Sequence, residues 1–269
     1  MSPSIFTNVV NAYLPEPHAS LLNGILFGTS LKTTKIFYEQ LKKVGLLHIV
    51  VLSGVNITLL AAIVATSTRY FSKHISIMLT ILIVVSFVIF VGPQAPIVRA
   101  ALMAVLTLVA ILFGRRNFAL YSLFLSAIVT GICWPHWLKT VSFQLSYGAT
   151  LGLILFSKKN PPPDQKSSFF SQLSYYCRDE LQTSFAAQIF TAPIIFLYFK
   201  EISLIAPISN LCVSFVIAPL MIFGFLTALL GKINFYLGLI PAYICYGLLN
   251  YVVFTIKFLS LIPFSFLKF

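Results

Sequence analysis

Charged side chains are scarce in this chain of 269 residues. Only 9% of the residues are charged, whereas 59% are hydrophobic, and the mean hydropathy is +0.96. This composition excludes an ordinary water-soluble domain and is typical of a protein with many membrane-spanning helices. A membrane β-barrel is excluded as well, because residues 75–91 are apolar almost throughout and do not alternate.

Carboxylates are especially rare. The chain has six acidic residues against 18 Lys and Arg, which gives a formal net charge of +12. All six lie in or beside predicted loops, and the lack of a mid-membrane carboxylate argues against proton- or sodium-coupled transport. The positive excess leaves two explanations open. It can reflect loop topology signals with attraction to anionic lipid, or it can reflect a polyanionic partner.

Metal-ligand patterns and a secretory signal are also missing. The four Cys are widely spaced without a C-x-x-C pair, and the four His are isolated, without an H-x-H-x-D cluster. We therefore expect no metal site and no cofactor, and we expect the cysteines to be packing residues. Residues 1–17 have no basic start followed by an apolar core, so insertion is expected to depend on internal spans.

Apolar segments of membrane length recur from residue 46 onward. We predict an all-α, polytopic helical membrane protein with about seven to nine transmembrane helices, some of them broken. The two longest segments contain prolines and are each predicted to be broken or bent. The predicted spans lie at 46–67, 75–91, 97–113, 118–134, 140–156, 181–199, 203–230 and 235–265.

Two other segments organise the chain. Residues 1–45 are the least membrane-like part, and we predict interfacial amphipathic helices at 19–31 and 33–44. Residues 46–269 form the helical membrane domain, which an internal loop at 157–178 divides, because a triple proline with charges cannot continue a helix in lipid. Basic residues of alternate loops, including this one, would face the cytoplasm by the positive-inside rule.

The first span carries polar residues where a simple anchor would carry Leu or Ile. They are His48, Ser53, Gly54 and Asn56. At 100° per residue, His48, Asn56 and Ser53 fall at about 0°, 80° and 140° around one helix, which forms a broad polar face. Polar groups in hydrocarbon are costly unless paired, so this face is predicted to line a path.

Arg99 follows a helix break. The segment VGPQAPIVRAALM contains Gly92, Pro93 and Pro96 just before Arg99. Arg99 can snorkel from an interfacial loop to lipid headgroups, or it can lie at a pore mouth beside exposed backbone groups that line a cavity.

A later span, SFQLSYGATLGLILF, places Gln144, Gly148 and Gly152 on one stripe. Gly148 and Gly152 form a small-xxx-small pattern that favours close helix packing, whereas Gln144 and Ser146 either bond across that interface or line a path. Similar polar positions recur at Gln188 and Asn210.

Taken in order, these motifs resemble the ComEC family. The matching segments are NGILFG, GLLHIVVLSGVNI, APIVRAALM, SFQLSYGATLGLILF, AAQIFTAP and APISNLC, between about residues 21 and 220. The resemblance implies an inner-membrane protein of bacteria through which single-stranded DNA is taken up in natural transformation, corresponding to the membrane part called the competence domain. It also implies functional positions at Gly45, His48, Ser53, Gly54, Arg99, Gln144 and Ser146. Asn56 stands where many members have a second His.

The resemblance has limits. Many members also have an oligonucleotide-binding-fold domain and a metallo-β-lactamase-like domain that is proposed to degrade one strand. Residues 1–45 are too short for the former, and no metal cluster supports the latter, so we expect no enzyme activity here. Strand degradation would come from another protein or from the rest of a longer chain. Expected partners are single-stranded DNA, membrane lipids, separate receptor, nuclease and cytoplasmic helicase proteins, and a second copy in a homodimer.

Two other functions stay open. Broken helices also suit a small-molecule or lipid permease of the cytoplasmic membrane, in which facilitated transport needs no carboxylate. An intramembrane serine hydrolase with Ser53 as nucleophile is the other, but it needs a base from another span, because His48 lies about 140° from Ser53 on the same helix.

Overall fold

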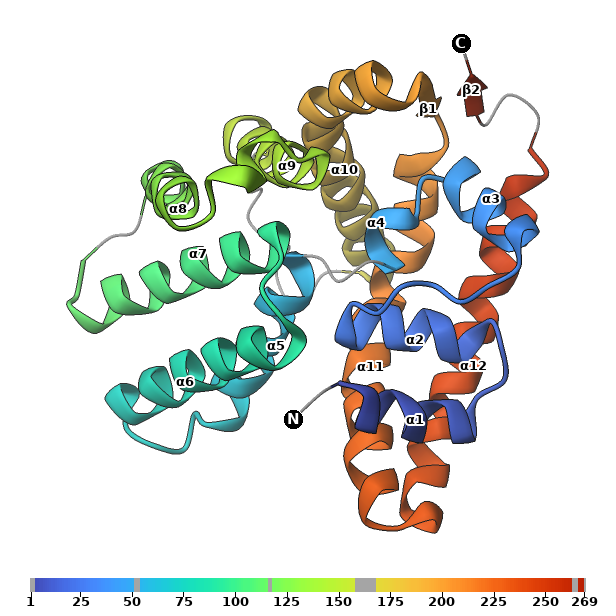
Figure 1. Ribbon diagram of the computed structural model, residues 1–269, viewed down its shortest axis with the longest axis horizontal. Helices are drawn as coiled ribbons and strands as arrows, with labels where there is room; N and C mark the ends of the chain where they lie inside the picture. Colours follow the sequence, from blue (N-terminus) through green and yellow to red (C-terminus); the bar gives the residue numbers. More distant parts are fainter. Residues whose placement is uncertain (1–2, 51–53, 116–117, 158–167, 263–265, 269) are drawn as a thin grey trace.

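The computed structural model describes residues 3–50, 54–115, 118–157, 168–262 and 266–268, most of them helical (Figure 1). The helices are α1 (Ser4–Tyr13), α2 (His18–Phe27), α3 (Lys35–Lys43), α4 (Leu47–Val50), α5 (Gly54–Ser67), α6 (Lys73–Val91), α7 (Ala95–Leu112), α8 (Ala119–Cys133), the 3-10 helix η1 (Pro135–Lys139), α9 (Val141–Phe156), α10 (Phe169–Phe199), α11 (Ala206–Ile233) and α12 (Phe235–Ser260). Strands β1 (Glu201–Ser203) and β2 (Phe266–Lys268) pair antiparallel.

The prediction of a helical, multi-pass membrane protein is confirmed. Helices α6, α7, α10, α11 and α12 are long and apolar enough to cross a membrane, and α2, α5, α8 and α9 are shorter apolar helices. Large apolar side chains are exposed on these helices, among them Ile89 at 74% and Ile132 at 76%. Exposed side chains of this kind are expected to face lipid.

One group of helices surrounds the larger core. Helices α1, α2, α3, α11 and α12 contribute its buried residues, including Leu22, Leu41, Met221 and Leu249. Figure 1 shows α11 and α12 side by side as a long antiparallel pair, with α1 and α2 crossing them. This pair forms the rigid frame of that half of the molecule.

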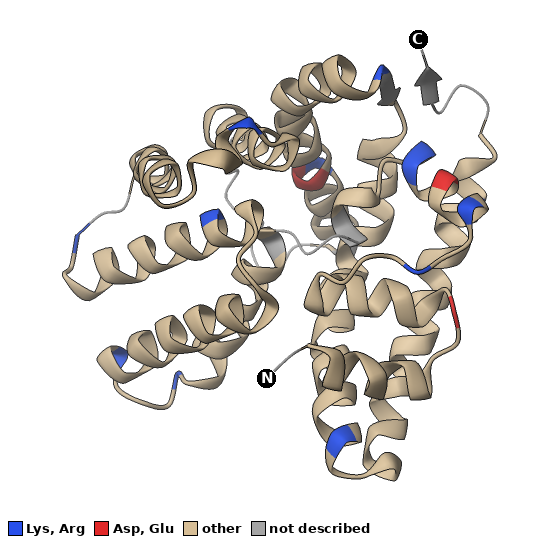
Figure 2. Ribbon diagram, in the orientation of Figure 1, with Lys and Arg blue, Asp and Glu red and all other residues tan. Residues whose placement is uncertain are grey.

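A second group consists of α5 to α9. A small core of Ile57, Val84, Ile97 and Ala101 lies between α5, α6 and α7. Helix α10 packs on both α9 and α11 and therefore joins the two groups (Figure 1). In Figure 2, basic residues at the α5–α6 and α7–α8 connections lie at the same end of the second group, as the alternation of spans predicts.

The N-terminal segment differs from a pair of amphipathic helices. Helix α3 has one buried side, with Phe37 and Leu41, and Thr34 caps its N-terminus. Every residue of α2, in contrast, is buried. Helix α2 lies among α1, α4, α11 and α12, so its polar residues are covered by protein on all sides.

The predicted break points also differ in part. Helix α11 continues through Pro219 and α12 through Pro241, so neither long segment is broken within its helix. Helix α10 begins at Phe169, well before the predicted start at residue 181, and shortens the dividing loop. In the first span, the described residues form α4 up to Val50 and α5 from Gly54, and residues 51–53 lie outside the described residues.

Candidate functional site

Arg99 lies where three helices of the second group meet. Gly92, with φ of +100°, ends α6, and α7 begins at Ala95 with proline in its first turn, so the predicted break places Arg99 early in α7. The Arg99 guanidinium donates a hydrogen bond through Nη1 to Thr150 Oγ1 of α9. The Thr150 hydroxyl in turn donates to the backbone carbonyl of Ser146, at 2.9 Å.

Gly54, the first residue of α5, makes room for this side chain. A Cβ atom at position 54 would meet Nη2 of Arg99 and would lie 3.2 Å from the Cβ of Ala100. Glycine is therefore the residue that allows α5 to approach the guanidinium. Two residues predicted from separate segments, Gly54 and Arg99, are in this way brought together.

The charge of Arg99 is not balanced by an acidic side chain. Within the described residues, no carboxylate forms an ion pair with it, and Tyr147 is the one ionisable neighbour that acts on it electrostatically. Its Nε atom is buried and has no hydrogen-bond partner among the described residues. The Arg99 side chain is half-buried, and leaving its buried Nε donor unpaired in a low-dielectric environment is costly, so an anion at this position would lower the free energy of the site.

A second set of polar groups continues this layer into α8. The Tyr147 hydroxyl donates to Ser126 Oγ, at 3.2 Å, and lies 3.3 Å from Thr130 Oγ1. Ser126 and Thr130 are fully buried. Sequence reasoning missed Tyr147, Thr150, Ser126 and Thr130. The signal for Ser126 and Thr130 was a polar stripe on α8, in which Ser122, Ser126 and Thr130 are spaced by four residues.

Asn56 faces away from Arg99, toward the other group of helices. It is 2% exposed, and its Nδ2 donates a hydrogen bond of 2.8 Å to the backbone carbonyl of Ile25 in α2. This bond ties α5 to α2. The structure therefore gives Asn56 a joining position between the two helix groups.

His48 lies on α4, apart from Arg99. Its side chain is exposed, and its Nδ1 is 2.9 Å from the backbone carbonyl of Gly45. Gly45 has φ of +73° and packs against the start of α11, where a Cβ would come within 2.6 Å of the Cβ of Ala206. Ser209 Oγ also donates to the carbonyl of Val44, at 2.6 Å. Contacts with α11 thus position the turn before His48. Ser53 lies outside the described residues.

The later polar residues occupy two helix interfaces. Asn210 of α11 donates through Nδ2 to Ser184 Oγ of α10, at 3.2 Å, and its Oδ1 is buried without a partner. Gln144 on α9 and Gln188 on α10 are both half-buried. The structure therefore joins Asn210 to the AAQIFTAP helix but does not bring it to Arg99.

Gly148 and Gly152 face α10. A Cβ at position 152 would meet the backbone carbonyl oxygen of Ala186, whereas one at position 148 would lie 3.3 Å from Ile194 Cδ1 and 3.5 Å from Phe190 Cβ. Helices α9 and α10 approach most closely at Gly152. Close packing of backbones at small residues is the usual basis of helix association in membranes.

Comparison with known proteins identifies the family of this chain. The family model described as Competence protein matches residues 25–269. The chain belongs to the Competence protein family. It is accordingly a competence-related, multi-pass membrane protein. The match extends through α11 and α12, beyond the end of the motifs that carry the resemblance in sequence.

Two curated relatives of this Competence family chain show how much of a longer protein it matches. ComE operon protein 3 of Bacillus subtilis (strain 168) is 26% identical over 209 residues, which are 76% of this chain and 26% of the relative. An uncharacterized protein of Aquifex aeolicus (strain VF5) is 28% identical over 136 residues, or 50% of this chain and 32% of the relative. The matches thus span about a quarter to a third of those relatives. No solved structure matches the chain.

Proposed function

We propose that this chain forms a path through which single-stranded DNA crosses the bacterial cytoplasmic membrane during natural transformation. The observation that carries the proposal is Arg99, a cation that forms no ion pair with a carboxylate of the described residues and that is held between α5, α7 and α9 of a Competence family protein. Membership of the Competence family indicates the biological process, and the guanidinium of Arg99 is a group that can bind phosphate.

A single strand carries one negative charge per nucleotide, so its passage through hydrocarbon requires cations or hydrogen-bond donors along the way. Guanidinium groups suit this task, because they stay charged and present several donors to phosphate oxygens. Arg99 uses one donor on Thr150 and keeps Nε without a partner. The polar layer of Ser126, Thr130 and Tyr147 continues from the same place into α8.

Other polar residues have supporting parts in this proposal. His48 is exposed on α4, and we propose that it contacts the strand before the strand reaches Arg99. Gln144 on α9, Gln188 on α10 and Asn210 on α11 are proposed to line the path farther from Arg99. A receptor, a nuclease, a helicase and a second copy of the chain are further proposed partners.

The test measures labelled DNA that reaches a DNase-protected compartment in the competent host, with surface-bound DNA scored separately. The gene is deleted, and in separate strains it is replaced with a gene that encodes the Arg99→Gln, Arg99→Lys or Arg69→Gln variant. Arg69 is the matched control, because it is an exposed arginine between α5 and α6 that contacts Tyr70. We expect Arg99→Gln to lower internal DNA by about tenfold, the equivalent of one charge-assisted hydrogen bond. Arg69→Gln should leave it near the wild-type level.

Membrane abundance is measured for each variant by quantitative blotting. The proposal fails if Arg99→Gln is as abundant as wild type and imports DNA equally well. It also fails if deletion leaves internal DNA unchanged, and the permease hypothesis would then lead. Partial recovery by Arg99→Lys would support a role for the charge itself.

A further inference from the structure

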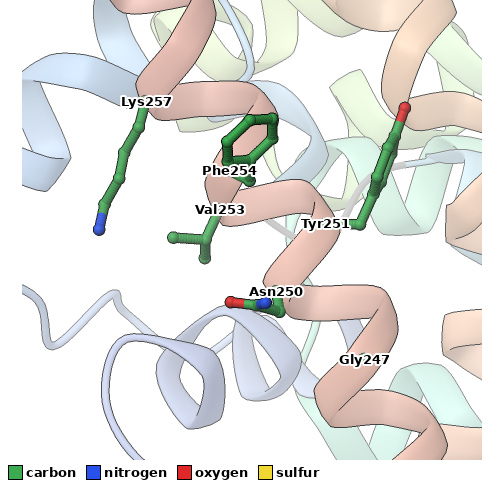
Figure 3. Close-up of a pocket in the computed structure, with 6 residues that line it drawn as sticks. All are labelled: Gly247, Asn250, Tyr251, Val253, Phe254 and Lys257. Carbon is green, nitrogen blue, oxygen red and sulfur yellow. The ribbon is translucent and has the colours of Figure 1, made fainter.

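A surface pocket on α12 lies far along the chain from Arg99. Its volume is about 360 Å³, and it is lined by Gly247, Asn250, Tyr251, Val253, Phe254 and Lys257 (Figure 3). In Figure 3, Asn250, Val253 and Lys257 project from one side of α12, whereas Tyr251 points to the opposite side. Tyr251 is occupied there by a hydrogen bond to the carbonyl of Cys212.

Asn250 and Lys257, which line the pocket, share one face of the helix with Val253 and with Tyr246 outside the pocket. Tyr246, Asn250, Val253 and Lys257 are spaced by four, three and four residues, so they form one stripe. This stripe runs along the side of α12 that packs against α2. Asn250 and Lys257 are both exposed, Asn250 lies within pairing reach of His18 in α2, and Lys257 forms no ion pair with another described residue.

His18, the first residue of α2, lies against this stripe. Its ring stacks near Tyr246, with 5.0 Å between the ring centroids, and Asn250 and Lys257 are the polar groups of α12 that act on it. The side chain is 8% exposed, and neither ring nitrogen has a hydrogen-bond partner in the described structure. Asn250, which lines the pocket, is the side chain that can pair with this imidazole, so the two groups lie together beside the pocket.

The chemistry of this cluster suits an anion. It combines an ammonium group, an amide that can donate and an imidazole that can donate from either nitrogen. Lys257 lies in the last turn of a membrane-length helix, where headgroups are expected. Phe254, which lines the same pocket, is 66% exposed, and the neighbouring Phe258 is 61% exposed. Apolar surface directly beside the cation is what a lipid tail would cover.

The geometry points to a binding site for the phosphodiester headgroup of an anionic phospholipid, formed by Lys257, Asn250 and His18. The phosphate pairs with Lys257 and accepts hydrogen bonds from the amide and the imidazole, while an acyl chain lies along Phe254. The site stabilises the packing of α2 on α12 and does not depend on the path proposed at Arg99.

The experiment uses the full chain purified in detergent and analysed by native mass spectrometry after addition of phosphatidylglycerol or phosphatidylcholine. The variants are Lys257→Gln, Lys257→Arg, Asn250→Leu and His18→Phe. Lys232→Gln is the matched control, because Lys232 also lies in the last turn of a long helix, α11, but sits over the ring of Phe6. Wild type should retain phosphatidylglycerol in preference to phosphatidylcholine.

We expect Lys257→Gln to lower phosphatidylglycerol retention by about fivefold, since one lysine at a membrane surface contributes roughly that factor. Asn250→Leu and His18→Phe should lower it as well, whereas Lys257→Arg and Lys232→Gln should not. Thermal unfolding in phosphatidylcholine identifies any variant that is misfolded, and Lys257→Arg shows that the position tolerates change.

Three results would overturn the inference. Equal retention of both lipids would mean that Lys257 only reaches toward headgroups in general. Equal losses in Lys257→Gln and Lys232→Gln would assign the effect to net charge. Displacement of phosphatidylglycerol by inorganic phosphate or a short oligonucleotide would assign the pocket to a free phosphate or to DNA.

Discussion

The side-chain amide of Asn56 in α5 donates a 2.8 Å hydrogen bond to the backbone carbonyl of Ile25 in α2. This bond crosses between the two groups of helices. An aromatic contact also joins the two groups: Phe87 of α6 lies near Phe225 of α11, with 6.0 Å between the ring centroids. The second group, which holds Arg99, is thus fixed to the frame made by α11 and α12.

Replacing Asn56 with Leu should loosen this junction. The Ile25 carbonyl would be left buried and unpaired, at a cost of about 1–3 kcal/mol in the free energy of unfolding. We expect the melting temperature in detergent to fall by about 2–4 °C for each kcal/mol lost. Thr58→Val is the control, because its hydroxyl bonds to the carbonyl of Gly54 within its own helix and is exposed. A melting temperature equal to the control would contradict the joining role.

A comparison of Gly45 with Gly114 distinguishes the cost of a left-handed backbone from the cost of a steric clash. Both have positive φ, +73° and +65°, but a Cβ at position 45 would lie 2.6 Å from that of Ala206, while one at position 114 would meet nothing within 4 Å. Gly114→Ala should therefore cost about 1–2 kcal/mol from the left-handed conformation alone. Gly45→Ala should cost more and should also displace the turn before His48. Equal melting temperatures for the two variants would show that α3 and α11 are not in close contact there.

At the α9–α10 interface, we expect substitution of Gly152 to destabilise the protein more than substitution of Gly148. Gly152→Ala places a methyl group against the backbone carbonyl of Ala186, which cannot move aside as a side chain can. Gly148→Ala meets the flexible end of Ile194 first. We expect Gly152→Ala to destabilise by about 1–3 kcal/mol more than Gly148→Ala, measured as the loss of folded protein on heating in detergent. Gly148→Leu, which is far larger, should fail to accumulate in the membrane. The reverse order for the two Ala variants would mean that α9 and α10 cross at Gly148.

Most of the fold could be predicted from the sequence, because long apolar segments in a chain so poor in charge can only be spanning helices. The break before Arg99 was also readable, since Gly92 and Pro93 favour the end of one helix and Pro96 suits the first turn of the next. The burial of α2 could not be read in the same way. Its ten residues look like a surface helix with polar positions, and only the packing of α1, α11 and α12 around it decides that they are buried.

The sequence predicted several residues of the candidate site but not which of them contact one another. Periodicity places Gly54 and Arg99 on their own helices, but it does not state which helices meet, so the partner Thr150 was overlooked. Asn56 was predicted to line a path with His48. In the structure, it lies on the side of α5 that contacts α2, where its amide donates to the Ile25 carbonyl, and a helical wheel does not show which side of a helix meets another helix. The role of each of these residues in transport stays a prediction.

Gly54→Ala gives the sharpest test of how Arg99 is held. The added methyl group would occupy the position of the guanidinium, but that group is the end of a flexible chain and can move. We therefore expect near-normal stability, since alanine favours a helix more than glycine does, together with a fall in DNA uptake of about tenfold as Arg99 leaves Thr150.

Thr150→Val should lower uptake by the same route. If both changes act on the position of Arg99, the double variant should import little less DNA than either single variant, because the second change removes a contact already lost. Additive losses would instead assign separate roles to Gly54 and Thr150.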